Sequence, residues 1–218
     1  MDQSWLLYLR YYWYNNDKEF VEVLTMVLAV KNKGISYTYA DYLDWDDGQR
    51  WELIHGVAYN MSPAPSRRHQ EISQTLSRKI GNYLDGKPCK VYTAPFDVRL
   101  PLDGEDDKST GNVVQPDIVV ICDKEKLDDQ GCIGAPDFII EILSPGTVKL
   151  DMVIKLHLYE KAGVKEYWLV HPTDHTVTVF KLGEDGMYGR YEVYDHSEQL
   201  SVGIFSDLVL ELSEIFAE

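Results

Sequence analysis

The sequence predicts an α/β fold in which helices cover a mixed β-sheet. Two segments have helical periodicity, and each is followed by strand-like segments. Two of the strands, PDIVVI and DFIIEIL, are apolar almost throughout, which is typical of strands buried on both faces. Helices that bracket such strands cover the faces of one sheet. The expected core elements are, in chain order, a helix at 69–86, strands at 90–100, 116–121 and 137–143, a helix at 144–163 and a strand at 166–172.

The first 35 residues differ from the rest of the chain. They are rich in aromatic residues and lack the layout of a secretory signal, because Asp2 comes early and Arg10 interrupts the apolar run. The later apolar run at 21–30 is too short to span a bilayer. We therefore expect residues 1–35 to form a flexible N-terminal extension, residues 36–218 to form one domain, and no segment to enter a membrane.

A short helical turn and a hairpin are expected before the core. Thr38 is a residue type that caps helix N-termini, and the amphipathic segment YADYLDW follows it. WELI and VAYNM then flank His55-Gly56, a two-residue connection typical of a tight hairpin turn. The sequence therefore predicts an extra N-terminal hairpin.

The two core helices have recognisable ends. The second helix opens at SPG, with Asp151 near its N-terminal end, Lys161 near its C-terminal end and Gly163 as C-cap. The first helix ends near Gly86, and its apolar stripe consists of Ile72, Leu76, Ile80 and Tyr83/Leu84.

The connecting segments complete the expected domain. We expect 90–100 to be one strand and the acidic segment 101–112 to be a mobile loop. Additional C-terminal strands are expected at 176–182, at 189–196 and in the segment that ends at residue 205.

The net charge of −15 argues against a broad nucleic-acid-binding surface, since Lys and Arg supply phosphate affinity. The stretch from Arg67 to Lys90 is an exception, because it contains six basic residues and only two acidic ones, Glu71 and Asp85. A solvated helix face is the favoured interpretation of this stretch, and a phosphate-contacting face is the alternative. Its basic residues are Arg67, Arg68, Arg78, Lys79, Lys87 and Lys90.

The three cysteines are odd in number and lack metal-ligand spacing. Cys122 and Cys132 lie in or beside apolar runs, so we expect both to be buried thiols. This usage favours a reducing cytoplasm.

Glu141 lies in the middle of an apolar strand, where a buried carboxylate costs several kcal/mol, roughly, unless a cation or hydrogen-bond donors meet it. Because side chains alternate along a strand, Glu141 shares a face with Asp137, Ile139 and Leu143, and the remaining side chains face the other way. Asp117 enters from a separate strand, behind Pro116. Two carboxylates that converge at one end of a sheet are suitable ligands for Mg²⁺, which prefers oxygen.

Lys155 lies four residues after Asp151 on the second helix, so the two side chains share a helix face. The spacing alone favours a surface ion pair. The alternative is an inward ammonium group that positions or deprotonates water near the metal.

Four segments, taken together, resemble the Uma2 (DUF820) family, a branch of the PD-(D/E)XK nuclease superfamily. They are WELIHGVAYNMSPAPSRRH, QPDIVV, DFIIEILSPGT and DMVIKLHLYEKAGVKEYWLVHP. The resemblance extends from about Tyr37 to Phe216. It implies a restriction-endonuclease-like α-β-β-β-α-β core with a mixed central sheet, which is the order of elements given above.

The resemblance also implies an active site. Asp117 and Glu141 match the acidic residues of the motif, with both binding Mg²⁺, and Glu52 matches an acidic residue on the first hairpin that faces the same site. Leu143 stands where the superfamily pattern has a lysine. The matching lysine of Uma2-like proteins comes from the following helix, which is Lys155 here and favours its inward interpretation.

Candidate substrate-binding residues surround this set. His69 matches the family's histidine after the SP-rich loop, where a substrate contact and a packing role are both open, and the helix dipole disfavours its charged form. Gln115 is a candidate for binding a ligand water, with a solvent-facing strand end as the alternative. Arg67 and Arg68 are the basic candidates beside His69. Tyr167 and Trp168 are expected in the core.

The leading expectation is therefore Mg²⁺-dependent hydrolysis of DNA phosphodiester bonds, with Mn²⁺ as a possible substitute, by a homodimer. The main alternative is a nuclease-like fold that acts as a binding or assembly module without turnover, which the acidic charge favours. A metal-free hydrolase of sugars with two carboxylates is disfavoured by Lys155 and by the lack of an extended aromatic cleft.

Overall fold

The computed structural model describes residues 31–32, 34–61 and 64–217. Most of the predicted N-terminal extension, including the apolar run at 21–30, lies outside these residues. In the described ranges, no helix has both the length and the apolar character needed to cross a membrane.

The central sheet has six strands, and the segments predicted for the core form its middle. β9 and β10 are parallel, whereas the other neighbouring pairs are antiparallel, so the sheet is mixed as predicted. Its spatial order is β12 (Glu192–Asp195), β11 (Thr176–Lys181), β10 (Glu166–His171), β9 (Phe138–Ile142), β6 (Ile118–Ile121) and β3 (Lys90–Thr93).

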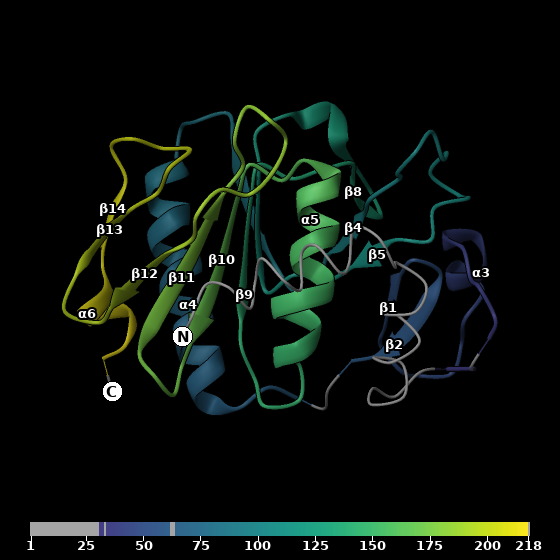
Figure 1. Ribbon diagram of the computed structural model, residues 1–218, viewed down its shortest axis with the longest axis horizontal. Coiled ribbons are helices and arrows are strands. Elements are labelled where there is room, and N and C mark those ends of the chain that lie inside the picture. The colour runs from purple at the N-terminus through teal and green to yellow at the C-terminus, as the bar shows by residue number, and fades with distance from the viewer. Residues whose placement is uncertain (1–30, 33, 62–63, 218) are drawn as a thin grey trace.

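Two helices cover the opposite faces of this sheet, α4 (Arg67–Leu84) behind it and α5 (Leu156–Ala162) in front (Figure 1). The predicted stripe of α4 is buried against Phe138, Ile140 and Ile142, although Tyr83 is only partly buried. The other face of β9 contributes Ile139 to the cluster that contains the apolar residues of α5. The alternation predicted for this strand is therefore confirmed, as is the α-β-β-β-α-β order of the core.

The second core helix begins with a π-helical segment, Leu150–Lys155, that continues directly into α5. Gly163 caps the C-terminus with φ of 90°, a left-handed conformation that glycine adopts without steric cost. The π-helical segment was not predicted. Such segments often occur at functional sites because they change the direction of side chains within a helix.

The predicted hairpin forms, with φ values of 51° at His55 and 75° at Gly56. Unexpectedly, it belongs to a second six-stranded sheet, seen beside α5 in Figure 1. The spatial order of this sheet is β2 (Val57–Asn60), β1 (Trp51–Ile54), β5 (Val113–Val114), β4 (Asp97–Arg99), β8 (Gly131–Ile133) and β7 (Leu127–Asp128).

The prediction of one strand at 90–100 is wrong. The segment divides into β3, in the central sheet, and β4, in the second sheet. Pro95 lies between them, and a proline cannot donate a backbone hydrogen bond to a strand ladder. The apolar residues on both sides of the break read as one strand because periodicity does not report a change of sheet.

Smaller elements close the ends of the domain. α3 (Tyr39–Leu43) begins after Thr38, which forms the predicted cap together with Asp41. A 3₁₀ turn occupies Lys124–Lys126. β13 (Gln199–Ser201), β14 (Val209–Glu211) and α6 (Leu212–Ile215) follow the central sheet, and their apolar residues join the core cluster of α4.

The cysteine prediction is partly wrong. Cys89 and Cys122 form a disulfide, so Cys122 is not a free thiol. The two residues extend the antiparallel register in which Lys90 lies opposite Ile121, which brings them side by side. Cys132 is the predicted buried thiol.

Candidate active site

Lys155 is buried among three carboxylates. Its Nζ lies 2.9 Å from Oε1 of Glu52, 2.9 Å from Oε1 of Glu141 and 3.3 Å from Oδ1 of Asp151. The Lys155 side chain is 4% exposed. The inward interpretation of Lys155 is therefore confirmed, and the surface ion pair favoured by spacing alone is wrong.

The three carboxylates come from three different parts of the fold. Glu52 lies on β1 of the second sheet, Glu141 on β9 of the central sheet, and Asp151 on the π-helical segment with Lys155 itself. The lysine therefore joins the two sheets through the helix that follows β9. An ammonium group with three carboxylate partners satisfies the requirement that buried charges be paired.

Glu141 is met by donors on both of its oxygens. Tyr159 donates its hydroxyl to Oε1 at 2.9 Å, and the backbone N–H of Asp117 donates to Oε2 at 3.3 Å. Burial raises the pKa of Glu141 well above its usual range, and the neighbouring carboxylates act in the same direction, although Lys155 opposes them. The strand centre that looked unfavourable for a carboxylate is thus provided with a cation and two donors.

Asp117 and Glu141 face each other across two antiparallel strands. Ile118 of β6 lies opposite Ile140 of β9, so the next position of the register places Asp117 opposite Glu141. The backbone N–H of Ile142 donates to Oδ2 of Asp117 at 2.8 Å, which mirrors the bond from Asp117 N–H to Glu141. The convergence predicted from the two sequence segments is present.

Asp117 also contacts His69. The Nε2 atom of His69 lies 3.1 Å from Oδ2 of Asp117, and the Asp117 side chain is 21% exposed. Burial disfavours the charged imidazole, but the Asp117 carboxylate outweighs it and raises the pKa of His69 above its usual 6.5. The direct contact with the Asp117 carboxylate therefore outweighs the influences that disfavour the charged form of His69.

Lys155 remains charged in this environment. Burial alone would lower its pKa, but the Glu141, Glu52 and Asp151 carboxylates raise it well above its usual value. A lysine that holds its proton this strongly donates hydrogen bonds and supplies positive charge.

The donor chemistry suits a hard cation. Carboxyl groups outnumber the ammonium group, because Glu52, Glu141 and Asp151 surround Lys155 and Asp117 lies beside Glu141. Asp117 offers oxygen ligands at the partly exposed edge of this cluster, next to the buried Glu141. Mg²⁺ typically takes one or two protein carboxylates plus waters and phosphate. Within the described ranges, however, no three His, Cys, Asp or Glu side chains are arranged to hold a metal ion.

Gln115 is a buried linker, which excludes the solvent-facing alternative. Its backbone N–H donates to Oε1 of Glu52 at 2.8 Å, and its side-chain amide donates to Oδ1 of Asp97 at 2.8 Å. Its side-chain oxygen accepts from the guanidinium of Arg50. All of these groups lie at the end of β5 that leads into Asp117.

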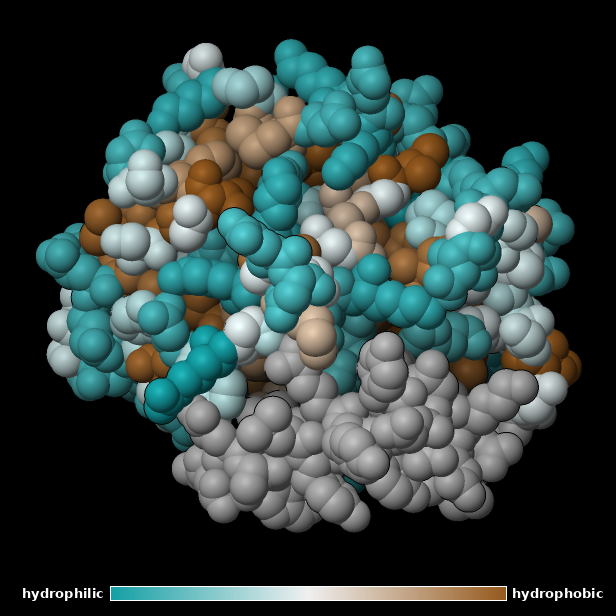
Figure 2. Space-filling view, turned by 45° about the horizontal axis from the view of Figure 1, so that its top comes forward, coloured by the Kyte–Doolittle hydropathy of each residue, from teal (hydrophilic) through white to brown (hydrophobic). Residues whose placement is uncertain are grey.

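The basic candidates at the start of α4 have partners of their own. Arg67 pairs with Glu71, and Arg68 donates to the carbonyl oxygens of Phe216 and Ala217. Lys79 pairs with Glu214. This pairing supports the solvated-face interpretation of the basic stretch. The face of the molecule shown in Figure 2 mixes hydrophilic residues with smaller hydrophobic areas.

Several site residues were missed from the sequence. Tyr159 follows Lys155 by four residues, so helical spacing could have placed both on one face. Arg50 and Asp97 carried no such signal, because both contact Gln115, which is distant from them in sequence and comes close through the pairing of β1, β5 and β4. Tyr167 and Trp168 are fully buried, as predicted.

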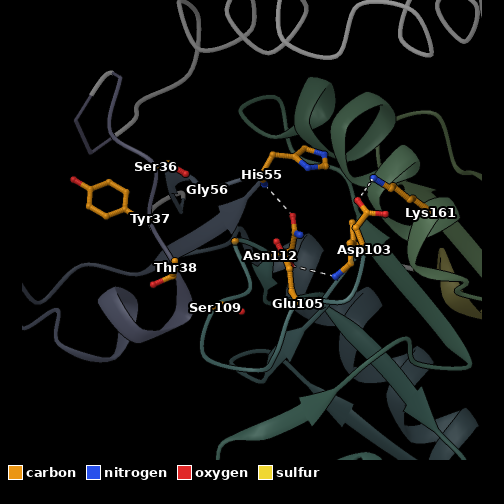
Figure 3. Close-up of a pocket in the computed structure, with 12 residues that line it drawn as sticks. Ser36, Tyr37, Thr38, His55, Gly56, Asp103, Glu105, Ser109, Asn112 and Lys161 are labelled. Carbon is orange, nitrogen blue, oxygen red and sulfur yellow. Dashed lines mark hydrogen bonds and ion pairs between the residues drawn. The ribbon is translucent and has the colours of Figure 1, made fainter.

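A cavity of about 230 Å³ lies at the other end of the hairpin (Figure 3). It contains none of the predicted site residues. His55 and Gly56 of the hairpin turn contribute to its wall, and the ion pair between Lys161 and Asp103 lies on another side. The carboxylate cluster is therefore separate from this cavity.

Comparisons with known proteins identify the family and the fold of this chain. The Uma2 family, described as a putative restriction endonuclease, matches residues 39–213. A crystal structure of a putative nuclease belonging to DUF820 from Anabaena variabilis shares the fold, with a TM-score of 0.66 and 22% identity over 83% of this chain and 97% of that one. The Synechocystis sp. protein named "Uncharacterized protein slr1290" is 29% identical over 169 residues, which cover 75% of this chain and 85% of the relative. With a family match over most of its length and the fold of a DUF820 structure, this chain belongs to the Uma2 family.

Proposed function

We propose that this protein is a Mg²⁺-dependent endonuclease that hydrolyses phosphodiester bonds in DNA. One observation carries the proposal: Glu52, Asp117, Glu141 and Lys155 come from separate elements and converge at one end of the central sheet. Membership of a family described as a putative restriction endonuclease supports the same reaction class.

In this proposal, Asp117 and Glu141 hold the ion, with Glu52 as a further candidate ligand, and Mn²⁺ can substitute. The bound ion would polarise the scissile phosphate and lower the pKa of a bound water. Lys155, whose N–H groups bond to the Glu52, Glu141 and Asp151 carboxylates, supplies positive charge that stabilises negative charge developing on the phosphoryl oxygens. Glu52 and Tyr159 keep Lys155 and Glu141 in place. His69 orients Asp117 through its Nε2 atom and is, in this proposal, the candidate for a substrate contact beside Asp117.

A plasmid-cleavage assay with Mg²⁺ or Mn²⁺ tests the proposal. Asp117→Asn and Glu141→Gln should each reduce cleavage by about a hundredfold or more, because a metal ligand supplies several kcal/mol of transition-state stabilisation. Asp137→Asn is the matched control, since Asp137 is a buried carboxylate immediately before β9 that bonds to Cys122 N–H and Lys165 away from the site. Undiminished cleavage by Glu141→Gln would refute the proposal.

The second candidate function is a binding or assembly module without turnover. Two observations favour it: Lys155 already pairs with three of the carboxylates, and the described residues contain no ready three-ligand metal site. Titration calorimetry with Mg²⁺ and with Mn²⁺ separates the two functions. The endonuclease requires binding that Asp117→Asn abolishes, whereas a module requires none.

We also propose that the working form is a homodimer in the cytoplasm. Superfamily resemblance supports dimerisation, and sedimentation of the purified protein measures it. The low cysteine content supports a reducing compartment, but disulfides are rare there, so the bond between Cys89 and Cys122 weighs against this location.

A further inference from the structure

Arg50 lies at the edge of the carboxylate cluster, immediately before β1 and two residues before Glu52. Its side chain is exposed to solvent. The Nε and Nη2 atoms both donate to Oε1 of Gln115, Nε at 3.1 Å. The guanidinium group is therefore held in one orientation although it lies at the surface.

Gln115 connects this guanidinium to the site. Its backbone N–H bonds to Glu52, which pairs with Lys155, and Asp117 follows Gln115 after a single proline. Its side-chain amide is fixed by Asp97. The position of Arg50 is thus set by the same strand end that delivers Asp117.

Arg50 has no direct carboxylate partner among the described residues, although the Asp97 carboxylate bonds to the same Gln115 amide. Lys155 and Arg67, in contrast, pair directly with carboxylates. In the described part of the chain, no carboxylate lies within salt-bridge distance of Arg50, and the oxygen it contacts belongs to a neutral amide. Its Nη1 atom has no hydrogen-bond partner among those residues.

We propose that Arg50 is a substrate-binding residue that contacts a backbone phosphate of DNA next to Asp117 and Glu141. This inference rests on the proposed function and assigns part of its substrate contact. A guanidinium held at one edge presents its remaining N–H donors in the planar arrangement that suits phosphate oxygens. In a chain with a net charge of −15, such a local cation is needed to bring phosphate to an acidic site.

Orienting Gln115 is the alternative role of Arg50. The two roles differ in their dependence on salt, because a phosphate contact releases a counterion and an internal hydrogen bond does not. They also differ in the expected effect of Arg50→Lys on DNA binding. Lysine keeps the positive charge that a phosphate contact needs, so a phosphate-binding role would be largely retained. It loses the double contact with the Gln115 amide oxygen, so an orienting role would be lost.

The test measures binding of a fluorescein-labelled DNA duplex by anisotropy over a range of salt concentrations. Ca²⁺ replaces Mg²⁺ as an oxygen-binding divalent ion, to separate binding from cleavage. The variants are Arg50→Gln and Arg50→Lys. Arg190→Gln is the matched control, because Arg190 is an exposed arginine far from the site. It follows β11, and the last residue of β11, Lys181, lies at the opposite end of the central sheet from Glu141.

We expect Arg50→Gln to weaken binding by about tenfold at low salt. The slope of log K against log salt concentration should become shallower by about one unit in this variant. Arg50→Lys should retain most of the slope, and Arg190→Gln should match the wild-type protein. Thermal melting of each variant verifies folding, and Arg50→Lys provides the test if Arg50→Gln does not fold.

Three results would overturn the inference. If Arg50→Gln binds with wild-type affinity and slope while the wild-type protein cleaves DNA, the Arg50 contact fails and the proposed function stands. If Arg50→Gln and Arg190→Gln weaken binding equally, the effect is one of overall charge. If the wild-type protein binds no duplex at any salt concentration, both the DNA substrate of the proposed function and the Arg50 contact fail.

Discussion

Lys155 has the densest set of charged contacts in the site. Its three carboxylate partners come from β1, β9 and the π-helical segment, and all are at most 4% exposed at the side chain. Removal of one partner of a buried ion pair leaves the others uncompensated, which is why such residues tolerate substitution poorly. The same charge that we assign to catalysis therefore also stabilises the fold.

Substitution of Lys155 by Met should lower the free energy of unfolding by about 3–5 kcal/mol, because three buried carboxylates lose their cation. Urea denaturation at neutral pH measures this change. Lys161→Met is the control, since Lys161 pairs with Asp103 at the surface and such pairs contribute about 0–1 kcal/mol. Equal effects of the two substitutions would contradict the assigned role.

Asp151 should make stability depend on pH. Burial raises its pKa from 3.8 to about 6, although Lys155 opposes the shift. The folded state therefore binds a proton that the unfolded state has released, and stability should fall as pH rises from 3.8 to about 6. Denaturation of the wild-type protein and of Asp151→Asn across this range measures the effect. The variant should lose less stability, and coincident pH profiles would show that Asp151 does not titrate there.

At the scale of elements, β3 depends on a single neighbour. Among the described strands it lies at the edge of the central sheet and pairs with β6 alone, the strand that has Asp117 just before it and Cys122 just after it. The bond between Cys89 and Cys122 links the two strands across a sequence separation of 33 residues. The disulfide thus holds the edge strand against the strand that positions the site.

Loss of this disulfide should lower the free energy of unfolding by about 3–4 kcal/mol, the range expected for a loop of that length. Denaturation with and without a reductant measures the loss in the wild-type protein. The double variant Cys89→Ser, Cys122→Ser should be equally destabilised and insensitive to the reductant. A wild-type protein that does not respond to reductant would mean that the thiols are free in solution, as a reducing compartment requires.

The elements that were predicted well are those whose pattern is local. The stripe of α4, the cap at Thr38 and the turn at His55-Gly56 all depend on residues close in sequence. The failures at 90–100 and at Leu150–Lys155 share another cause. The chain changes sheet at Pro95, and Leu150–Lys155 is π-helical, but hydrophobic periodicity distinguishes neither from a continuous strand or an ordinary helix.

At the scale of the whole molecule, the site lies where the two sheets meet. Glu52 belongs to the second sheet, whereas Asp117 and Glu141 belong to the end of the central sheet. The carboxyl groups of the site outnumber its two basic groups, those of Lys155 and His69. A bound divalent cation would compensate this excess and should therefore favour the folded state.

Mg²⁺ should raise the melting temperature of the wild-type protein. A ligand at a hundred times its dissociation constant stabilises the folded state by about 2.7 kcal/mol when it does not bind the unfolded chain. Thermal denaturation at increasing Mg²⁺ concentration measures this stabilisation. Asp117→Asn should abolish it and Asp137→Asn should retain it. An increase that persists in Asp117→Asn would place the bound ion elsewhere.

The sequence by itself determined the order of the core elements, the two faces of β9 and the family resemblance, because these depend on local periodicity and on short motifs. It also identified Asp117, Glu141, Glu52 and Lys155 as candidates. Only the tertiary structure decided that Lys155 points inward, that His69 contacts Asp117 and that Gln115 joins Arg50 to Glu52. Each of these contacts joins segments that are distant in sequence, and neither residue spacing nor hydropathy records which distant segments become neighbours.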